Sequence, residues 1–317
     1  MKCFLFITFL FFSNFIFCQP NTQLHSIKPN WKLGDIKKVH TVTFTNIYIK
    51  DSLVNNTEVK SYYSIAVIDT NKHYTLSYSI ESNSLDVKTE SNISEVDSAL
   101  AIMTDIIKNI EEETQSFQYE ILVDKKTGQA LEVKNSDKFL TLIEKATSNV
   151  IDKFGNKLGM SSTPIDSIKQ KVGSYFKLKG PNILKTMLNE FNYIMGAYSL
   201  TFPYNSSISQ EALVHDVNTL GEFGDIEFPA FITTSSKKTD ESLTIQTDTD
   251  YDKEYLLNQF KKKHKSMAEL TTSDIYLSEK TEAIFTNAKN WIVSQSSIVI
   301  FKVKEVKVIN ETKVSFQ

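Results

Sequence analysis

The sequence predicts an α+β protein of mostly antiparallel β-sheet, half-barrel-like, with helices packed on one face. Residues 74–80 alternate apolar and polar side chains, which is the pattern of a strand buried on one side. Short polar segments separate such stretches, as expected for the turns of a meander. Amphipathic segments with apolar side chains every three or four residues lie between the strand-like stretches. These segments predict helices that cover the sheet.

The first expected element is a strand-rich meander over residues 37–80. We expect turns at Asn55 and Asn56 and at residues 70–72, because these residue types favour turn conformations. Residues 61–69 are apolar on both faces, which favours a position in the middle of the sheet. The meander therefore supplies the central strands.

A helix is expected over residues 94–110, where Ser94 and Asp97 resemble a capping box and the apolar side chains form one stripe. A hairpin over residues 119–133 follows, with its turn near Gly128. Further helices are expected over residues 139–154, 164–176 and 181–194, and the last of these starts at Pro181. Strands are then expected over residues 210–217, 226–234 and 242–249. A helix over residues 252–267 and long strands within residues 282–316 complete the expected elements.

The chain contains a faint internal repeat, because residues 120–133 align without gaps on residues 282–295. Gly128 then meets Asn290, and both residue types tolerate the positive φ of a tight turn. Two similar halves are one interpretation, and two unrelated hairpins are the other. The expected organisation is residues 1–18, an N-terminal half of residues 19–160, and a half of residues 161–317 that holds the helical middle and the C-terminal strand–helix–hairpin unit.

The first 18 residues have the features of a secretory signal peptide. Lys2 precedes an apolar run from Phe4 to Phe12, and polar residues follow. The run is shorter than the roughly 20 apolar residues that span a bilayer. Cleavage is expected after Cys18; the alternative is lipidation of Cys18, which the bulky Phe17 disfavours. We therefore expect a periplasmic or extracellular protein, with an outer-membrane lipoprotein as the alternative.

The composition excludes several classes of function. The chain has 35 basic residues, all of them lysine, and 38 acidic residues, a balance that argues against nucleic acid as a partner. Cys3 and Cys18 are the only cysteines, so a mature chain beginning after Cys18 has no disulfide and no thiol chemistry. Without arginine, bidentate guanidinium recognition of phosphate or carboxylate is excluded.

An acidic run resembles a calcium loop but lacks half of its ligands. Asp248, Asp250 and Asp252 alternate as calcium ligands do, yet Lys253 stands where the loop needs glycine, and Gln259 stands where it needs glutamate. We expect these acids instead to end a strand and to cap the following helix. No metal site and no cofactor is assigned.

A basic run over residues 261–265 is expected at the end of the same helix, where cations suit the exposed carbonyls. Peripheral contact with an anionic membrane is the alternative for this run. The histidines occur singly and no catalytic motif is present, so no catalytic residue is assigned. A hydrolase with a dispersed site is left open, with His215, Asp216 and Asp248 as its candidate residues.

The meander, the helix and the hairpin with the sequence VDKKTGQALEV together resemble envelope proteins of the lipoprotein-localisation (LolA/LolB-like) superfamily. Many secreted bacterial proteins share this layout. The resemblance implies an open half-barrel of antiparallel strands whose concave apolar face is covered by helices. It also implies binding of acyl chains or of another apolar ligand.

The leading functional expectation is a non-catalytic protein that holds an apolar ligand or lipid moiety between sheet and helices. The expected cavity-lining residues lie on two helices, and they are Leu100, Met103, Ile107, Leu184, Met187 and Phe191. Two alternatives remain: an interaction module with a filled core that works through strand edges or loops, and the dispersed hydrolase. The oligomeric state is left open.

Overall fold

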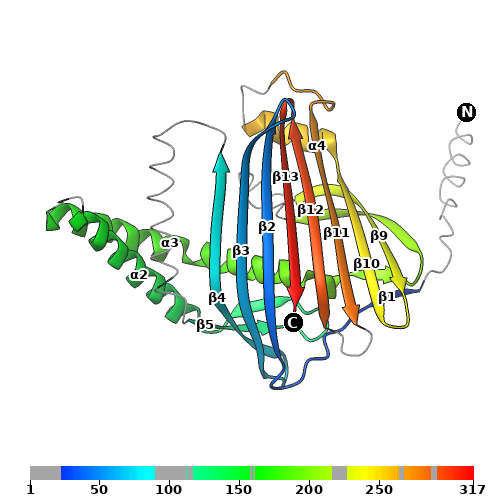
Figure 1. The fold of residues 1–317 in the computed structure, drawn as a ribbon, viewed down its shortest axis with the longest axis horizontal. Coiled ribbons are helices and arrows are strands. Elements are labelled where there is room, and N and C mark those ends of the chain that lie inside the picture. The colour runs from blue at the N-terminus through cyan, green and yellow to red at the C-terminus, as the bar shows by residue number, and fades with distance from the viewer. Residues whose placement is uncertain are drawn as a thin grey trace, which may run out of the picture.

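The computed structural model describes residues 23–89, 112, 117–157, 159, 161–215, 227–263, 268–286 and 291–317. Within them, one antiparallel sheet of 11 strands dominates (Figure 1). Its strands are β2 (Ile36–Ile49), β3 (Ser52–Asp69), β4 (Tyr74–Thr89), β5 (Gln118–Val123), β6 (Ala130–Val133), β8 (Ser207–His215), β9 (Glu227–Lys238), β10 (Ser242–Tyr251), β11 (Ile275–Thr286), β12 (Ile292–Val303) and β13 (Val306–Phe316). The α+β class expected from the sequence is confirmed.

The order of strands in the sheet is β6-β5-β4-β3-β2-β13-β12-β11-β10-β9-β8. Strands β2 to β6 form one meander in chain order, and strands β8 to β12 form a second. Strand β13 lies between them and pairs with β2 on one side and β12 on the other. Each expected hairpin, β5–β6 and β11–β12, forms the last two strands of its meander. Whether the two meanders are duplicates of one unit stays a hypothesis.

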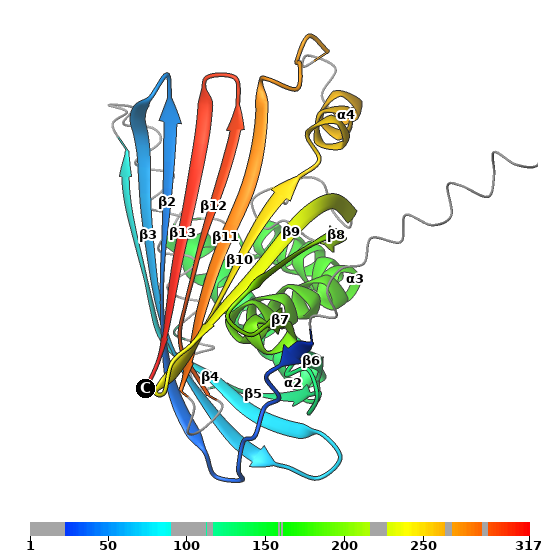
Figure 2. The same cartoon turned by 90° about the vertical axis from the view of Figure 1, so that its right-hand side faces the viewer.

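The helices lie on one side of the sheet, and the sheet curves around them (Figure 2). They are α2 (Ser136–Lys157), α3 (Ser162–Met195), the 3₁₀ turn η1 (Gly196–Ser199) and α4 (Lys253–Lys263). A short ribbon of β1 (Leu24–Ser26) and β7 (Thr201–Pro203) completes the described elements. We call the sheet face toward the helices the inner face and the opposite face the outer face. No described helix is long and apolar enough to cross a membrane.

The main core lies where α3, η1 and the N-terminal segment meet the inner face. Trp31 is 3% exposed and stacks on Trp291, with ring centroids 4.9 Å apart. Its indole Nε1 donates a hydrogen bond of 3.3 Å to the Tyr198 hydroxyl on η1. Gly128, in the β5–β6 turn, has φ +68°, and a Cβ there would lie 2.8 Å from the Tyr198 Cβ. The hairpin turn therefore needs glycine for its conformation and for this close packing.

A second core lies under α4 at the other end of the same face. Leu256, Leu257 and Phe260 on α4 are buried against Ile275 and Leu277 of β11. The Phe260 ring also stacks on Phe301 of β12, with centroids 5.6 Å apart. Two separate apolar cores thus hold helices on the inner face, one at each end of the long strands.

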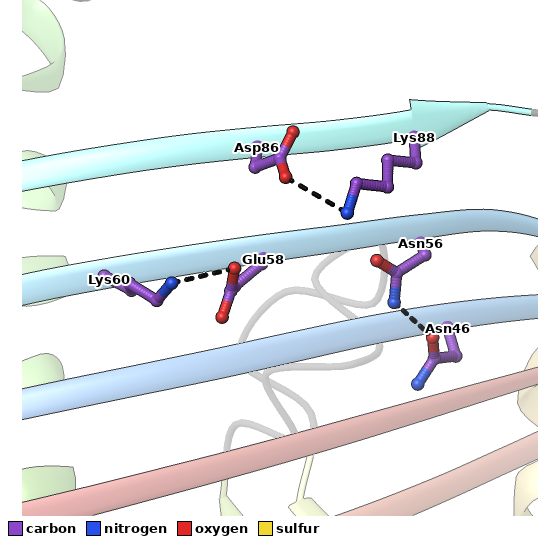
Figure 3. Close-up of polar contacts among 6 residues, drawn as sticks. All are labelled: Asn46, Asn56, Glu58, Lys60, Asp86 and Lys88. Carbon is purple, nitrogen blue, oxygen red and sulfur yellow. Dashed lines mark hydrogen bonds and ion pairs between the residues drawn. The ribbon is translucent and has the colours of Figure 1, made fainter.

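On the outer face of β2, β3 and β4, polar side chains contact one another (Figure 3). Lys60 Nζ lies 3.0 Å from Glu58, two residues away on the same strand. The Asn56 side chain donates a 2.7 Å hydrogen bond to Asn46 on the neighbouring strand. These contacts explain why charged and amide side chains occur in the middle of long strands without a turn.

The expected turn at Asn55 and Asn56 is wrong, because both residues lie inside β3. The chain turns earlier, at Lys50 and Asp51, which have φ of 51° and 63°. Two consecutive residues with positive φ make the tight turn whose twist suits a hairpin. The turn at residues 70–72 and the β5–β6 turn are confirmed.

The expected helix start at Pro181 is also wrong, because α3 runs through it without interruption. Proline removes one hydrogen bond of the helix. The packing of α3 on α2 offsets this loss, since Gly180 lies so close to Leu140 of α2 that a Cβ there would approach it to 3.0 Å. The expected helix over residues 94–110 lies outside the described residues.

Replacement of Trp31 by alanine tests the role of the aromatic core. We expect Trp31→Ala to lower the free energy of unfolding by about 3–5 kcal/mol, because it removes a buried indole and leaves a cavity. Urea unfolding followed by circular dichroism measures the change. The nearby Leu33 is 67% exposed, so Leu33→Ala is the matched control and is expected to change stability by less than about 0.5 kcal/mol. Equal effects of the two substitutions would contradict this description of the core.

Candidate functional site

Between its two cores, the inner face carries polar side chains in register. The strand pairing places six hydroxyl residues side by side on six adjacent strands. From β2 to β9 they are Thr43, Thr312, Ser297, Thr281, Thr247 and Thr234. Directly paired residues of an antiparallel sheet share a face and have Cβ atoms about 4.5–5.5 Å apart. We call these six residues the hydroxyl row.

The rows on either side of the hydroxyl row are polar as well. The row on the side of the aromatic core contains Ser61, Thr41 and Gln295. The row on the side of α4 contains Thr57, Thr45, Asn310, Glu279 and Thr249. Val314 interrupts the first of these rows, which beyond Gln295 continues into the buried apolar Ala283 and Ile245, and Val299 interrupts the second. We call the three rows together the polar band. It crosses the inner face as a polar belt between two apolar zones.

Helix α3 contacts the polar band through Tyr193. The Tyr193 hydroxyl hydrogen-bonds with the side chains of Ser297 and Thr312, and burial is the main cause that raises the pKa of this phenol. The backbone carbonyl of Tyr193 accepts a 2.9 Å hydrogen bond from Gln295 Nε2. Thr43 and Thr312 also bond to each other, at 3.1 Å between their hydroxyls. The band is therefore ordered by contacts between strands and by one helix.

Several buried atoms of the band have no hydrogen-bond partner among the described residues. They are Gln295 Oε1, Thr41 Oγ1 and Thr247 Oγ1, and Gln295 as a whole is 5% exposed. Leaving a buried polar atom unpaired costs about 1–3 kcal/mol. Most buried polar groups in native proteins are paired with protein or water, so unpaired ones call for an explanation. Here they mark hydrogen-bonding capacity that a bound molecule can use.

Glu279 is the acidic member of the polar band. The Tyr251 hydroxyl donates to Glu279 Oε2 at 3.3 Å, and the Thr281 hydroxyl donates to Oε1 at 3.5 Å. Burial raises the pKa of the Glu279 carboxyl above its usual value, and these two hydrogen bonds oppose the rise. Burial and the nearby Glu279 charge together raise the pKa of Tyr251. A partly buried carboxyl group thus lies between hydroxyl side chains and the edge of the apolar α4 core.

Beyond the polar band the inner face becomes apolar again. The next row contains Ile47, Val308, Phe301, Leu277 and Tyr251, of which Leu277 and Tyr251 belong to the core under α4. Toward β4 the apolar side chains are Val59, Leu85 and Val87, and Leu85 is 41% exposed. Apolar surface that is only partly covered therefore adjoins the polar band.

Of the six expected cavity-lining residues, the three on α3 lie at the main core. Phe191 is 1% exposed and meets the Tyr78 ring edge-on, so it belongs to the main core. Leu184 and Met187 are half-buried and pack against the same core. Leu100, Met103, Ile107 and Cys18 lie outside the described residues. A role of the six helix side chains in lining a binding cavity stays a prediction, and so does the lipidation of Cys18 that Phe17 disfavours.

The acidic run is positioned as expected from the sequence. Asp252 accepts a 2.9 Å hydrogen bond from the backbone N–H of Tyr255 and so caps α4. Asp248 lies on the outer face and pairs with Lys280 at 3.1 Å, away from the polar band. Among the described residues, no three histidine or acidic side chains are grouped so that they could hold a metal. Asp216 lies outside the described residues.

The outer face has a cavity of about 730 Å³ at the ends of β8, β9 and β10. Its lining includes the carboxylates of Glu211, Asp250 and Asp252 and the apolar side chains of Leu213 and Phe231. Glu211 and Asp250 are exposed to solvent, so they need no partner in the protein. The polar band is the stronger candidate site because its unpaired polar atoms are buried.

Comparison with known proteins gives weak structural likeness. No family model and no curated protein matches the chain, so the resemblance to lipoprotein-localisation proteins stays a prediction. A solved structure of lipovitellin, concerned with its lipid–protein interactions, is similar with a TM-score of 0.45 and 10% identity, over 91% of this chain and 25% of that one. The chain thus spans a quarter of the lipovitellin chain's length.

An outer membrane channel from Pseudomonas putida F1 is similar with a TM-score of 0.18 and 8% identity, over 92% of this chain and 98% of that one. At these TM-scores neither likeness bears on function. The function of this chain is therefore argued from its own residues.

Replacement of Glu279 by glutamine should change how stability depends on pH. Because burial raises the folded-state pKa, Glu279 contributes stability below its unfolded value of about 4.5, and this contribution is lost as pH rises through the raised pKa. Glutamine cannot ionise, so Glu279→Gln should gain stability relative to the wild type as pH increases. Urea unfolding at about pH 4 and about pH 8 measures this difference.

The control for this measurement is Glu282→Gln, because Glu282 lies on the same strand but on the outer face, where it bonds to Gln246. The difference in unfolding free energy between Glu282→Gln and the wild type should be the same at both pH values. A constant stability difference between wild type and Glu279→Gln across the pH range would contradict a buried, ionisable Glu279.

Proposed function

We propose that this protein is a non-catalytic binding protein that holds an amphipathic, lipid-like molecule against the inner face of its sheet. The observation that carries the proposal is the polar band, in which buried atoms of Gln295, Thr41 and Thr247 lack partners within the part of the chain that the structure describes. A purely apolar ligand would leave these atoms unpaired. A molecule with both a polar group and an apolar chain can satisfy them.

The two parts of such a ligand would meet different parts of the inner face. The polar group would bond with the polar band, where hydroxyls can donate or accept and Gln295 Oε1 accepts. The chain would cover apolar side chains beside the band, such as the half-buried Val59 and Val308 and the exposed Leu85. Each buried methylene contributes about 0.8 kcal/mol, so an alkyl chain supplies most of the affinity.

The proposal includes a location in the cell envelope, which the signal-peptide features of the first 18 residues support. A protein that leaves the cytoplasm meets lipids at membranes and in transit between them. The intact mass of the protein purified from its native cell tests this part. A chain starting at Gln19 supports free export, and an acylated Cys18 would mean a lipid anchor instead.

Native mass spectrometry of the purified full chain tests the ligand directly. The expected result is a bound species of lipid-like mass that organic solvent extracts. If no ligand is retained and added amphiphiles do not bind, the proposed function fails. A reproducible protein partner without any small ligand would favour an interaction module instead.

The valine variant of Thr247 tests the role of the polar band. Thr247→Val keeps the shape of the side chain and removes an unpaired buried hydroxyl. Stability should stay equal or rise by about 1 kcal/mol. Ligand binding should weaken by about fivefold, the value of one neutral hydrogen bond of about 1 kcal/mol. Retained ligand and titration of an added amphiphile are the measurements.

Thr244→Val is the matched control, because Thr244 lies on the same strand but faces outward, opposite Lys237 and Ile284. This variant should bind as the wild type does. Equal binding by both variants would show that the polar band does not contact the ligand.

A further inference from the structure

Glu279 is the one member of the polar band that can carry a charge. The other polar members of its three rows are hydroxyl and amide residues, with Val299 and Val314 between them. Lys280, the next residue along β11, points to the outer face and pairs there with Asp248 at 3.1 Å. Because neighbours in a strand point to opposite faces, this lysine cannot neutralise Glu279.

The groups that face Glu279 do not supply a positive charge either. Across the strands it pairs with Val299 on β12 and Thr249 on β10. The titratable groups beside it are the phenols of Tyr251 on β10 and Tyr193 on α3, and burial, with a smaller contribution from the Glu279 charge, raises the pKa of both. A phenol can only donate a hydrogen bond or become negative. Glu279 therefore has donors but no cation among the described groups around it.

A partly buried carboxylate without a paired cation favours a positively charged ligand over an anionic one. An anionic headgroup would meet the Glu279 charge in a low-dielectric site, where like charges repel strongly. An ammonium group would instead form charge-assisted hydrogen bonds, which are about twice as strong as neutral ones. The hydroxyl row beside Glu279 can accept the remaining N–H groups of an ammonium.

We propose that the ligand held on the inner face is an amphiphile with an ammonium headgroup, and that Glu279 is the residue that binds this headgroup. The inference rests on the proposed function, because it names the ligand class of the same site. Glu279 lies where the polar band meets the apolar side chains of Leu277 and Val299. An ammonium bound there leaves its alkyl chain beside apolar surface.

The test compares three amphiphiles that share a decyl chain: decylammonium, decyl maltoside and decyl sulfate. Each is titrated below its micelle concentration into the wild type, Glu279→Gln and Glu282→Gln, with binding followed by isothermal calorimetry. The wild type should bind decylammonium most tightly. Glu279→Gln should weaken decylammonium binding by about tenfold, the loss expected for one hydrogen bond to a charged group, and leave decyl maltoside within about twofold.

The control variant separates Glu279 from general attraction between charges. Glu282→Gln changes the net charge of the protein by the same amount but alters the outer face, so all three amphiphiles should bind to it as to the wild type. Circular dichroism checks that Glu279→Gln is folded, and glutamine can still accept the hydrogen bond from Tyr251.

The wild type alone provides a second measurement. A bound cation favours the ionised carboxyl, so decylammonium affinity should rise between about pH 5 and about pH 8, and decyl maltoside affinity should not. If decylammonium and decyl maltoside bind but neither pH nor Glu279→Gln distinguishes them, the role of Glu279 is refuted and the proposed function stands. If none of the three amphiphiles binds, the proposed function itself fails.

Discussion

The pairing of β13 with both β2 and β12 is the constraint on which the rest of the structure depends. This pairing joins two meanders into one sheet, and it aligns Thr43, Thr312 and Ser297 on one face. A shift of β13 by a single residue would turn Thr312 to the outer face and bring Lys313 or Glu311 inward, between Thr43 and Ser297. It would also separate Val314 and Phe316 from the main core. Stability and the candidate site therefore depend on the same register.

The inner face shows how polar groups can be retained within a sheet that also holds helices. Tyr193 hydrogen-bonds with Ser297 and Thr312, which satisfies part of the polar band. The unpaired atoms of Gln295, Thr41 and Thr247 remain a cost to stability. Valine or leucine at these positions would have removed that cost. Under the proposed function, a bound ligand pairs with these atoms and offsets their cost.

The sequence predicted local elements well, because alternation and helical spacing are local properties. Residues 74–80 were expected as a strand and lie in β4, and the turn at Gly128 lies where its positive φ is needed. Asn55 and Asn56 were misassigned to a turn, because their cross-strand partners Ile47 and Asn46 cannot be recognised in sequence. The continuity of α3 through Pro181 likewise depends on packing against Leu140.

The polar band could not be predicted, because its members come from seven strands, β3 included, and pair only in the folded sheet. Alternating threonines at Thr41, Thr43 and Thr45, and at Thr247 and Thr249, were the available signal. Threonine is common in any exposed strand face, so this signal alone does not indicate a buried row. The register and the burial together identify it.

The central position of β13 also has a consequence for the path of folding. Thr43 and Thr312 bond across adjacent strands although they are 269 residues apart in the sequence. Each meander can form from neighbouring segments, but the sheet closes only when this distant pairing is made. Contacts of such long sequence separation slow folding, because the chain must lose the entropy of a large loop first. Until then β2 and β13, which pairs with β12 through a local hairpin, are both open edges, and the open edges of β-strands are where chains misassociate.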